Sequence, residues 1–320
     1  MESKTSAYLN LKHKSIENQT GKLFGSLWGN LNDDQYKESV ALFTKRAVAN
    51  KFNLAWLKNK KCLDAGCGSG RYSVAMAIHG ARQIIALDIS KTGINEAKRR
   101  TSKFRQITFR KASVLQLPFR NKSFDFVWSA GVIHHTQDFD RALSELTRVL
   151  RKNGKLFLLV YGAGGLRWKA VKAIRNIFSD LSQDFLDKSI RFAKMSANNR
   201  KHFMDDLLVP IQKLTTFKEM QTKLHALGIK KIKRWTGDTF DHERNLETQL
   251  LDIKKIKKIA SACCQIAHSS KDRILSQIIK EIVDLYVKWT VRIMRSPKLS
   301  IKEKRKIIIG EGNLRILAEK

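Results

Sequence analysis

The stretch CLDAGCGSGRYS places three glycines, Gly66, Gly68 and Gly70, between an apolar run and a segment of helix-forming composition. The apolar residues from Cys62 to Ala65 predict a buried strand, and the following residues predict a helix over 71–79. Glycine accepts tight dihedral angles and leaves no side chain in the way, so a ligand can approach the main chain closely. The turn therefore predicts a binding site at the carboxyl end of a strand, although a tight turn without a ligand would use the same residues.

An acidic residue ends the next apolar run. QIIAL, residues 83–87, predicts a second strand, and Asp88 follows it, twenty residues after Gly68. A carboxylate at the tip of the strand beside a glycine-rich turn is well placed to accept hydrogen bonds from ribose hydroxyls. The competing interpretation is that Asp88 caps the next helix, but Ser90 is available for that role.

The glycine spacing departs from two common nucleotide-binding loops. Arg71 stands where the dinucleotide fingerprint requires its third glycine, and the Gly-Lys-Ser/Thr of a P-loop is absent. The run from Asp64 to Gly70 instead resembles the first motif of the class I S-adenosylmethionine-dependent methyltransferases, an acidic residue followed by x-G-x-G-x-G.

The resemblance extends over about residues 58–162. KASVLQLPF at 111–119 resembles the family's adenine-side loop, and FDFVWSAGVIHH at 124–135 resembles its fourth strand and the segment after it. Residues 141–160 resemble its next helix, turn and fifth strand. These blocks are most similar to those of the small-molecule methyltransferases that carry LPF and HH.

The order of elements supports an α/β fold. Strands alternate with helices, which indicates a parallel sheet covered on both faces, and the strand segments are continuous apolar runs. The resemblance implies a Rossmann-like, doubly wound, mostly parallel seven-stranded sheet. To this we add a helical cap and a helical C-terminal extension, predicted from the segments outside the core.

The resemblance also assigns roles around S-adenosyl-L-methionine. Asp64 would hold the amino group of the cofactor or brace the turn, Asp88 would accept both ribose hydroxyls, and Ser129 would face the sulfonium. The remaining implied cofactor residues are Gly66, Cys67 and Gly68 at the methionine end, Gly70 in the same turn, and Ile89, Ser113 and Val114 around the adenine.

The implied reaction is an in-line displacement on the methyl group. Because a sulfonium is already reactive, positioning and desolvation can supply much of the catalysis, and a general base is needed only when the acceptor must lose a proton. His134 is the candidate base, since histidine titrates near neutral pH. Both His134 and His135 can equally be buried residues that shape the pocket. No metal site is predicted, because the four cysteines lack metal-binding spacing.

The extent of the resemblance, together with the helical segments outside it, implies five expected parts of the chain. These are a helical N-terminal segment at 1–57, the cofactor-binding Rossmann-like core at 58–162, a helical cap insertion at 163–212, the remainder of the core at 213–240, and a basic helical extension at 241–320. In related enzymes a segment such as 1–57 often covers the cofactor. An insertion after the fifth strand would lie over the carboxyl ends of the strands, where an acceptor must bind.

The formal net charge of +33 raises the possibility of a nucleic-acid or acidic-membrane partner. The charge is spread, because residues 251–320 hold 17 Lys and Arg against 7 Asp and Glu, and the rest of the chain is basic too. A solvated basic surface is therefore the preferred interpretation. In the extension an apolar stripe at helical spacing indicates a packed face, with a membrane-surface helix as the alternative: Leu275, Ile278, Ile282, Tyr286, Trp289 and Ile293.

Three functions remain in competition. The preferred one is methyl transfer to a small-molecule acceptor such as a metabolite, a sugar or a lipid-like compound. An RNA methyltransferase is favoured only by the charge, and a non-catalytic cofactor-fold binding protein is opposed by the intact glycine turn and Asp88. No run is long enough to span a membrane, and MESKTSAYLN has no apolar signal region, so we expect a cytoplasmic protein. The sequence leaves the acceptor and the oligomeric state open.

Overall fold

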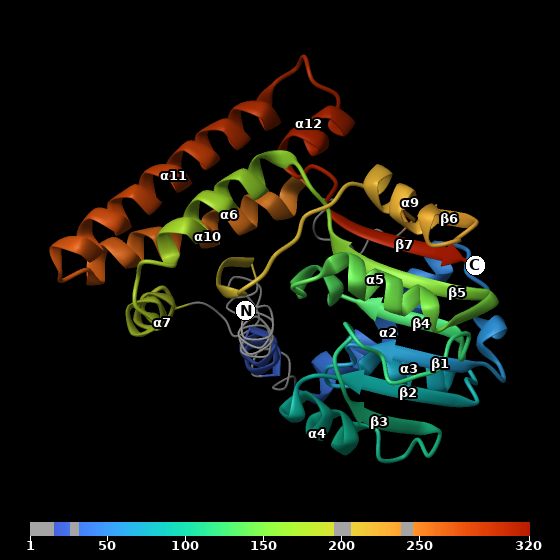
Figure 1. The fold of residues 1–320 in the computed structure, drawn as a ribbon. Coiled ribbons are helices and arrows are strands. Elements are labelled where there is room, and N and C mark those ends of the chain that lie inside the picture. Colours follow the sequence, from blue (N-terminus) through green and yellow to red (C-terminus); the bar gives the residue numbers. More distant parts are fainter. Residues whose placement is uncertain (1–15, 26–31, 195–205, 238–245) are drawn as a thin grey trace, which may run out of the picture. The chain divides into compact units, whose positions relative to one another are not determined.

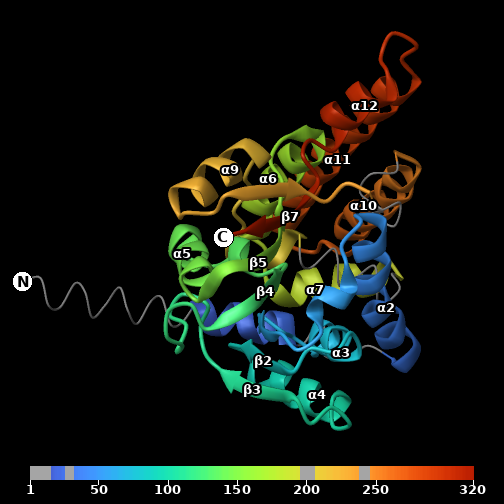
Figure 2. The same cartoon turned by 90° about the vertical axis from the view of Figure 1, so that its right-hand side faces the viewer.

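The computed structural model describes residues 16–25, 32–194, 206–237 and 246–320, and its chain divides into two compact units (Figures 1 and 2). Unit 1 comprises Met1–Tyr161, Pro210–Asp238 and Asn313–Lys320, whereas unit 2 comprises Gly162–Val209 and Thr239–Gly312. The chain thus leaves unit 1 twice and returns to it twice.

Unit 1 is built on one seven-stranded sheet in the order β3-β2-β1-β4-β5-β7-β6. The strands are β1 (Lys61–Ala65), β2 (Gln83–Asp88), β3 (Ile107–Lys111), β4 (Phe124–Ala130), β5 (Leu150–Tyr161), β6 (Lys231–Arg234) and β7 (Asn313–Glu319). Strands β1 to β5 pair in parallel, and β7 runs antiparallel to both of its neighbours. The mostly parallel, seven-stranded α/β class predicted from the sequence is confirmed.

The helices of unit 1 connect these strands and cover both faces of the sheet (Figure 2). They are α2 (Asp33–Ala49), η1 (Leu54–Leu57), α3 (Arg71–Ile78), α4 (Lys91–Arg100), η2 (Ile133–His135), α5 (Phe139–Arg148) and α9 (Phe217–Ala226), together with a helix over 16–25. Asp138 and Thr216 cap α5 and α9 with their side-chain oxygens. Such caps satisfy backbone N–H groups that the first helical turn leaves unpaired.

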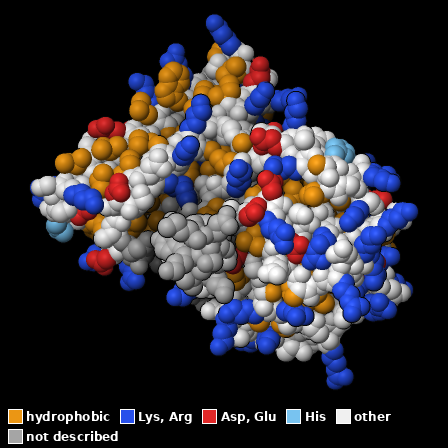
Figure 3. Space-filling view, in the orientation of Figure 1, with side chains coloured by type: hydrophobic (Ala, Val, Ile, Leu, Met, Phe, Trp, Pro, Cys, Tyr) orange, Lys and Arg blue, Asp and Glu red, His pale blue; other side chains and the backbone are white. Residues whose placement is uncertain are grey.

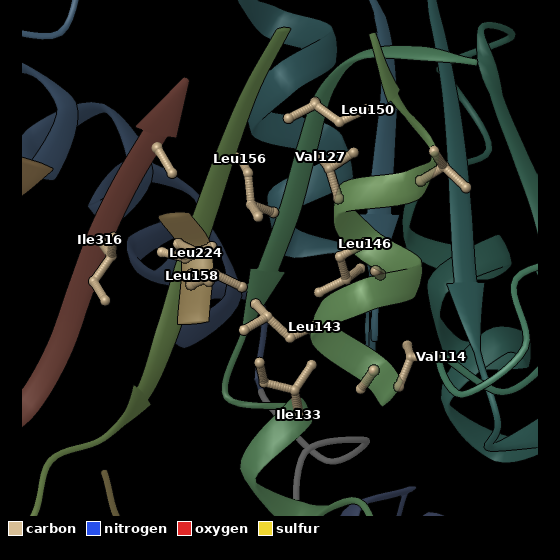
Figure 4. Packing of buried hydrophobic residues seen from close by; sticks show 14 of the residues in the cluster. Val114, Val127, Ile133, Leu143, Leu146, Leu150, Leu156, Leu158, Leu224 and Ile316 are labelled. Atoms are coloured by element: carbon tan, nitrogen blue, oxygen red, sulfur yellow. The ribbon is translucent and has the colours of Figure 1, made fainter. Parts of the chain in front are cut away.

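Alternate residues of the central strands bury against opposite faces of the sheet. In β4, Val127 joins a hydrophobic cluster with α5 and α9, whereas Phe126 and Trp128 join a second cluster with α2 and α3. Figure 4 shows the first cluster, in which Leu143 and Leu146 of α5 lie over the strands. Burial on both faces explains why the strand segments are continuous apolar runs.

The end of the chain differs from the expected helical extension over 241–320. Residues Asn313–Glu319 form β7, which lies between β5 and β6 in the sheet. Leu314 and Ile316 are fully buried, and Lys155 Nζ of β5 lies 2.6 Å from Glu319 Oε2. The apolar residues of this stretch alternate with period two, a strand pattern that the basic helical composition before it obscured.

Unit 2 is helical, and it is formed by two separate segments of the chain. Its helices are α6 (Gly165–Phe178), α7 (Gln183–Phe192), α10 (Leu246–Ile266), α11 (Ser270–Arg295) and α12 (Ile301–Ile308). Helix α11 packs against α10, α6 and α12, and α10 also packs against α7. The expected cap and the expected extension therefore contribute helices to one unit. In the described ranges, no helix is both long enough and apolar enough to cross a membrane.

Candidate functional site

The turn after β1 folds onto the end of β2. The backbone N–H groups of Gly66 and Cys67 both donate to the carbonyl oxygen of Leu87, at 2.8 and 2.9 Å. These bonds follow from the parallel pairing of β1 with β2, which ends with Ala65 opposite Leu87. The first two amides of the turn are therefore used inside the protein, so the turn offers a ligand a bare main-chain surface rather than a row of free donors.

The glycines of the turn serve different purposes. A Cβ atom on Gly66 would lie 2.2 Å from Val132 Cγ2, so this glycine is required by packing against the loop after β4. A Cβ atom on Gly68 would meet no atom of the described residues within 4 Å, and the same is true of Gly131, which follows β4. Because β1 and β4 are neighbours in the sheet, two glycines with open space beside them lie at adjacent strand ends.

Asp88 joins the tip of β2 to this turn. Its carboxylate accepts the N–H of Gly68 at 2.8 Å through Oδ2 and the N–H of Ser90 at 2.8 Å through Oδ1. Burial raises the pKa of Asp88, and backbone hydrogen bonds from Ser90, Gly68 and Ile89 oppose that rise. The N-cap of α4 is Ser90, whose hydroxyl accepts from Gly93 N–H at 3.1 Å, so Asp88 does not cap that helix. Each Asp88 oxygen keeps a second lone pair for a further donor.

Asp64 is a second carboxylate at the end of β1, and it is almost completely buried. The hydroxyl of Ser73 on α3 donates to Asp64 Oδ2 at 2.6 Å. Burial raises the pKa of Asp64 to about 7, against the lowering effect of the Ser73 hydrogen bond. The group is therefore poised to change its charge near neutral pH when a cation approaches.

The helix over 16–25 lies against the loops that follow β2 and β3. Ser113 donates its hydroxyl hydrogen to the Glu17 carboxylate, and a Cβ atom on Gly21 would lie 3.1 Å from Ile89 Cγ2. A Cβ atom on Gly25 would lie 2.5 Å from Ser90 Oγ. None of these helix residues was predicted from the sequence as a site residue. The signal that could have found them is the pair of glycines four residues apart, which lets a helix approach another backbone closely.

An aromatic cluster follows β4. The ring centroid of His134 lies 4.0 Å from that of His135 and 4.1 Å from that of Tyr161. The ring centroid of Phe24, in the N-terminal helix, lies 4.9 Å from that of His135. His134 is fully buried, and both of its ring nitrogens lack a hydrogen-bond partner in the described part of the chain. Burial, helped by the neighbouring His135, places the pKa of His134 well below its usual value. The imidazole is therefore neutral at physiological pH.

The remaining predicted residues lie at the ends of β3 and β4. Ser129 is buried, and within the residues that the structure describes its hydroxyl has no hydrogen-bond partner. The side chain of Val114 belongs to the hydrophobic core, as Figure 4 shows, so only its backbone remains for a ligand. Tyr36 of α2, which the sequence analysis did not name, donates its hydroxyl to the Ser69 carbonyl oxygen at 3.2 Å and braces the turn.

The described residues contain no group of three or more His, Cys, Asp or Glu side chains placed to hold a metal ion. What the site does contain is two carboxylates, at the ends of β1 and β2, and two unobstructed glycines at the ends of β1 and β4. This arrangement suits an organic ligand that carries both a cationic group and hydroxyl donors.

Comparison with known proteins places these residues in a family. Residues 63–158 match the family described as Methyltransferase domain. The chain is 29% identical over 172 residues to the 27-O-demethylrifamycin SV methyltransferase of Amycolatopsis mediterranei, covering 48% of this chain and 63% of that protein. It is 34% identical over 152 residues to the malonyl-[acyl-carrier protein] O-methyltransferase of Buchnera aphidicola, covering 47% of this chain and 59% of that protein.

The chain spans less than two thirds of the length of these relatives. Among solved structures, a putative sarcosine dimethylglycine methyltransferase from Galdieria sulphuraria aligns over 94% of this chain and 97% of its own, with a TM-score of 0.49 and 14% identity.

The raised pKa of Asp64 predicts a pH dependence of stability. Between the ordinary value of 3.8 and about 7, the folded protein keeps a proton that the unfolded chain has lost. The free energy of unfolding should therefore fall as pH rises through this window, by at most about 1.4 kcal/mol per pH unit from this group. In Asp64→Asn this contribution is absent. Urea unfolding at several pH values across the window should therefore give a less negative slope of the free energy of unfolding against pH than in the parent protein.

Asp125→Asn is the matched control for this measurement. Burial acts to raise the pKa of Asp125, but hydrogen bonds from the Lys61 amide and the Arg151 guanidinium lower this pKa below its ordinary value. That carboxyl is charged in both states across most of the window, so its removal should leave the slope unchanged. Equal slopes for Asp64→Asn and the parent protein would contradict the assignment.

Proposed function

Because the chain carries a class I S-adenosylmethionine-dependent methyltransferase domain, as its match over residues 63–158 establishes, we propose that the whole protein transfers the methyl group of S-adenosyl-L-methionine to a small-molecule acceptor. The observation that carries the proposal is the 2.8 Å hydrogen bond from Gly68 N–H to Asp88 Oδ2, with open space beside Gly68. It holds a bare main-chain surface and a carboxylate within reach of one nucleoside.

The residues of the site fit this cofactor. Asp64 is the carboxylate for the cationic amino group, and the pKa near 7 means that the approaching charge converts it to the ionised form. Asp88 keeps lone pairs for the two ribose hydroxyls. The Ser129 hydroxyl, at the end of β4, has no hydrogen-bond partner in the described ranges and supplies a polar group for the sulfonium side.

The adenine side is closed by the N-terminal helix. Ile89 supplies an apolar surface for the base, and Gly21 brings the helix into contact with that residue. Ser113 and its partner Glu17 supply polar atoms at the base edge. These contacts support the earlier expectation that the leading segment covers the cofactor, because they place helix 16–25 on the residues assigned to the adenine.

When bound, S-adenosyl-L-methionine supplies an electrophilic methyl group on a sulfonium that leaves as a neutral thioether. The protein's task is to hold the acceptor in line and exclude water, which alone can lower the barrier by several kcal/mol. We assign His134 as the general base for acceptors that must lose a proton. Its support is a neutral ring whose two nitrogens have no hydrogen-bond partner among the described residues.

A small-molecule acceptor is favoured over RNA. The relatives named above carry names that specify a rifamycin derivative and malonyl-[acyl-carrier protein] as acceptors. The end of β4 is Ser-Ala-Gly, without the Asn/Asp-Pro-Pro-Tyr type of motif that serves planar nitrogens. The intact carboxylates and open glycine positions also favour a cofactor-using enzyme over a non-catalytic binding protein.

Cofactor binding tests the site directly. Gly68→Val fills the open space and Asp88→Ala removes the ribose acceptor, so each should weaken S-adenosyl-L-methionine binding by about tenfold or more, roughly 1.4 kcal/mol. The measurement is isothermal titration calorimetry. Unchanged affinity in both variants would reject the site assignment.

Each variant has a control that shares its local structure. Gly228 also has a positive φ and no neighbouring atom within 4 Å of an added Cβ, so Gly228→Val imposes the same backbone strain away from the site. Asp125→Ala removes a carboxylate that accepts a backbone N–H at the opposite end of the sheet. Both control variants should bind the cofactor as the parent protein does.

The acceptor class is tested with tritium-labelled cofactor. The protein is incubated with a small-molecule extract or with bulk tRNA and rRNA, and we expect label in the small-molecule fraction only. The Gly68→Val protein serves as the blank, because it should not retain the cofactor. Transfer of label to RNA would replace this proposal with the alternative that the net charge of +33 suggested.

The role of His134 is tested by His134→Phe, which keeps a ring against Tyr161 but removes both nitrogens. Because the sulfonium needs no activation, we expect transfer to an acceptor that need not lose a proton to fall by less than about tenfold. His225→Phe is the control, since a ring nitrogen of His225, on α9, pairs with the carbonyl oxygen of Ile229, which follows that helix. A loss above about a hundredfold for such an acceptor, with cofactor affinity and thermal unfolding unchanged, would make the imidazole essential.

A further inference from the structure

Helix α11 is apolar on two sides. Its inner face is buried and packs within unit 2 through Ser276, Ile279, Val283, Tyr286 and Thr290. A helix on the surface of a globular protein normally carries polar residues on the opposite face. On α11 that face carries four large apolar side chains among its polar ones, and packing against the described residues leaves them exposed.

The exposed apolar residues form one stripe. Ile274 is 61% exposed, Ile278 40%, Leu285 57% and Trp289 49%. Their spacing of four, seven and four residues keeps them on one side of the helix over about 22 Å. The stripe predicted from the sequence included Ile278 and Trp289 as packed residues, and the structure leaves both exposed while it buries Tyr286.

Cations accompany the stripe. Lys271, Lys288 and Arg292 are exposed on the same side of the helix, and Glu281 is the one exposed acidic residue among them in the described helix. The Arg292 guanidinium lies 5.3 Å from the centre of the Trp289 ring. From α11 through α12, residues 270–306 hold eleven Lys and Arg against four Asp and Glu. Figure 3 shows hydrophobic side chains on the part of the surface that α11 occupies in Figure 1, with Lys and Arg beside them.

From this stripe and its cations we propose that the outer face of α11, defined by Ile274, Ile278, Leu285 and Trp289 with Lys271, Lys288 and Arg292, binds the surface of an anionic lipid bilayer. Separate apolar side chains on a convex helix can enter the boundary between headgroups and acyl chains, while Lys and Arg remain among anionic headgroups. Tryptophan beside arginine is the composition typical of that boundary.

Two other occupants fit the charges less well. A second copy that paired through the same face would bring together the three cations of each copy with only one acidic residue, Glu281, from each to offset them, which is unfavourable. A nucleic acid would contact the cations but would leave three aliphatic side chains without a partner, because its backbone contacts are polar. Only an anionic surface with an apolar layer beneath it satisfies both kinds of side chain.

The test is co-sedimentation of the full chain with vesicles of phosphatidylcholine alone or mixed equally with phosphatidylglycerol. We expect binding to the mixed vesicles only, and weaker binding as salt rises. The double variant Leu285→Ser, Trp289→Ser and the double variant Lys288→Gln, Arg292→Gln should each lower the binding constant by about tenfold or more.

Matched controls lie on unit 1. The double variant Val48→Ser, Ile78→Ser removes apolar side chains that are 64% and 59% exposed, and Lys98→Gln, Lys103→Gln removes two exposed cations. Both should bind the mixed vesicles as the parent does. Circular dichroism melting and cofactor calorimetry verify that every variant remains folded.

Three results would overturn the proposal: no binding to mixed vesicles, equal binding to phosphatidylcholine alone, or equal losses in the control variants. Sedimentation velocity decides the remaining alternative, because a dimer that dissociates on Leu285→Ser, Trp289→Ser would identify the face as a self-association surface. None of these measurements depends on methyl transfer, so the proposed function stands or falls separately.

Discussion

The hydrogen bond from Gly68 N–H to the Asp88 carboxylate is the constraint on which the site depends, because it ties the turn after β1 to the tip of β2 at 2.8 Å. Two further bonds, from Gly66 and Cys67 to the Leu87 carbonyl oxygen, fold the same turn onto the same strand. Together they fix where the main chain is bare and where the carboxylate lies. A ligand that contacts both therefore meets a preformed surface and spends little free energy on ordering it.

The second carboxylate, Asp64, differs from Asp88 because its pKa lies close to neutral pH. Asp88 accepts hydrogen bonds from backbone N–H groups, whereas Asp64 is almost completely buried and is hydrogen-bonded to Ser73. Burial raises the pKa of Asp64 to about 7. A buried acid of this kind is costly to ionise until a cation arrives beside it. Asp64 can thus stay protonated and neutral when no cation is near, and it can become a carboxylate anion when a cationic ligand binds.

The methyltransferase domain occupies less than a third of the chain, and the chain around it adds two kinds of element. The helix over 16–25 approaches Ile89 and Ser90 through Gly21 and Gly25, so it covers the loop that follows β2. Unit 2 is inserted at two points of the core, between β5 and α9 and between β6 and β7. Helix α11 of unit 2 carries a second, exposed apolar face, so this unit adds an apolar surface to the protein.

The sequence by itself determined the strand-turn-helix at 62–79, the carboxylate at position 88 and the α/β class, because glycine spacing, apolar runs and capping residues are local signals. Tertiary structure alone decided that residues 313–319 enter the sheet between β5 and β6, since strand pairing joins residues more than 150 positions apart. It also decided that Val114 points into the core, that His134 is fully enclosed, and that Glu17 meets Ser113. Such contacts depend on which elements the fold brings together, and no local pattern records that.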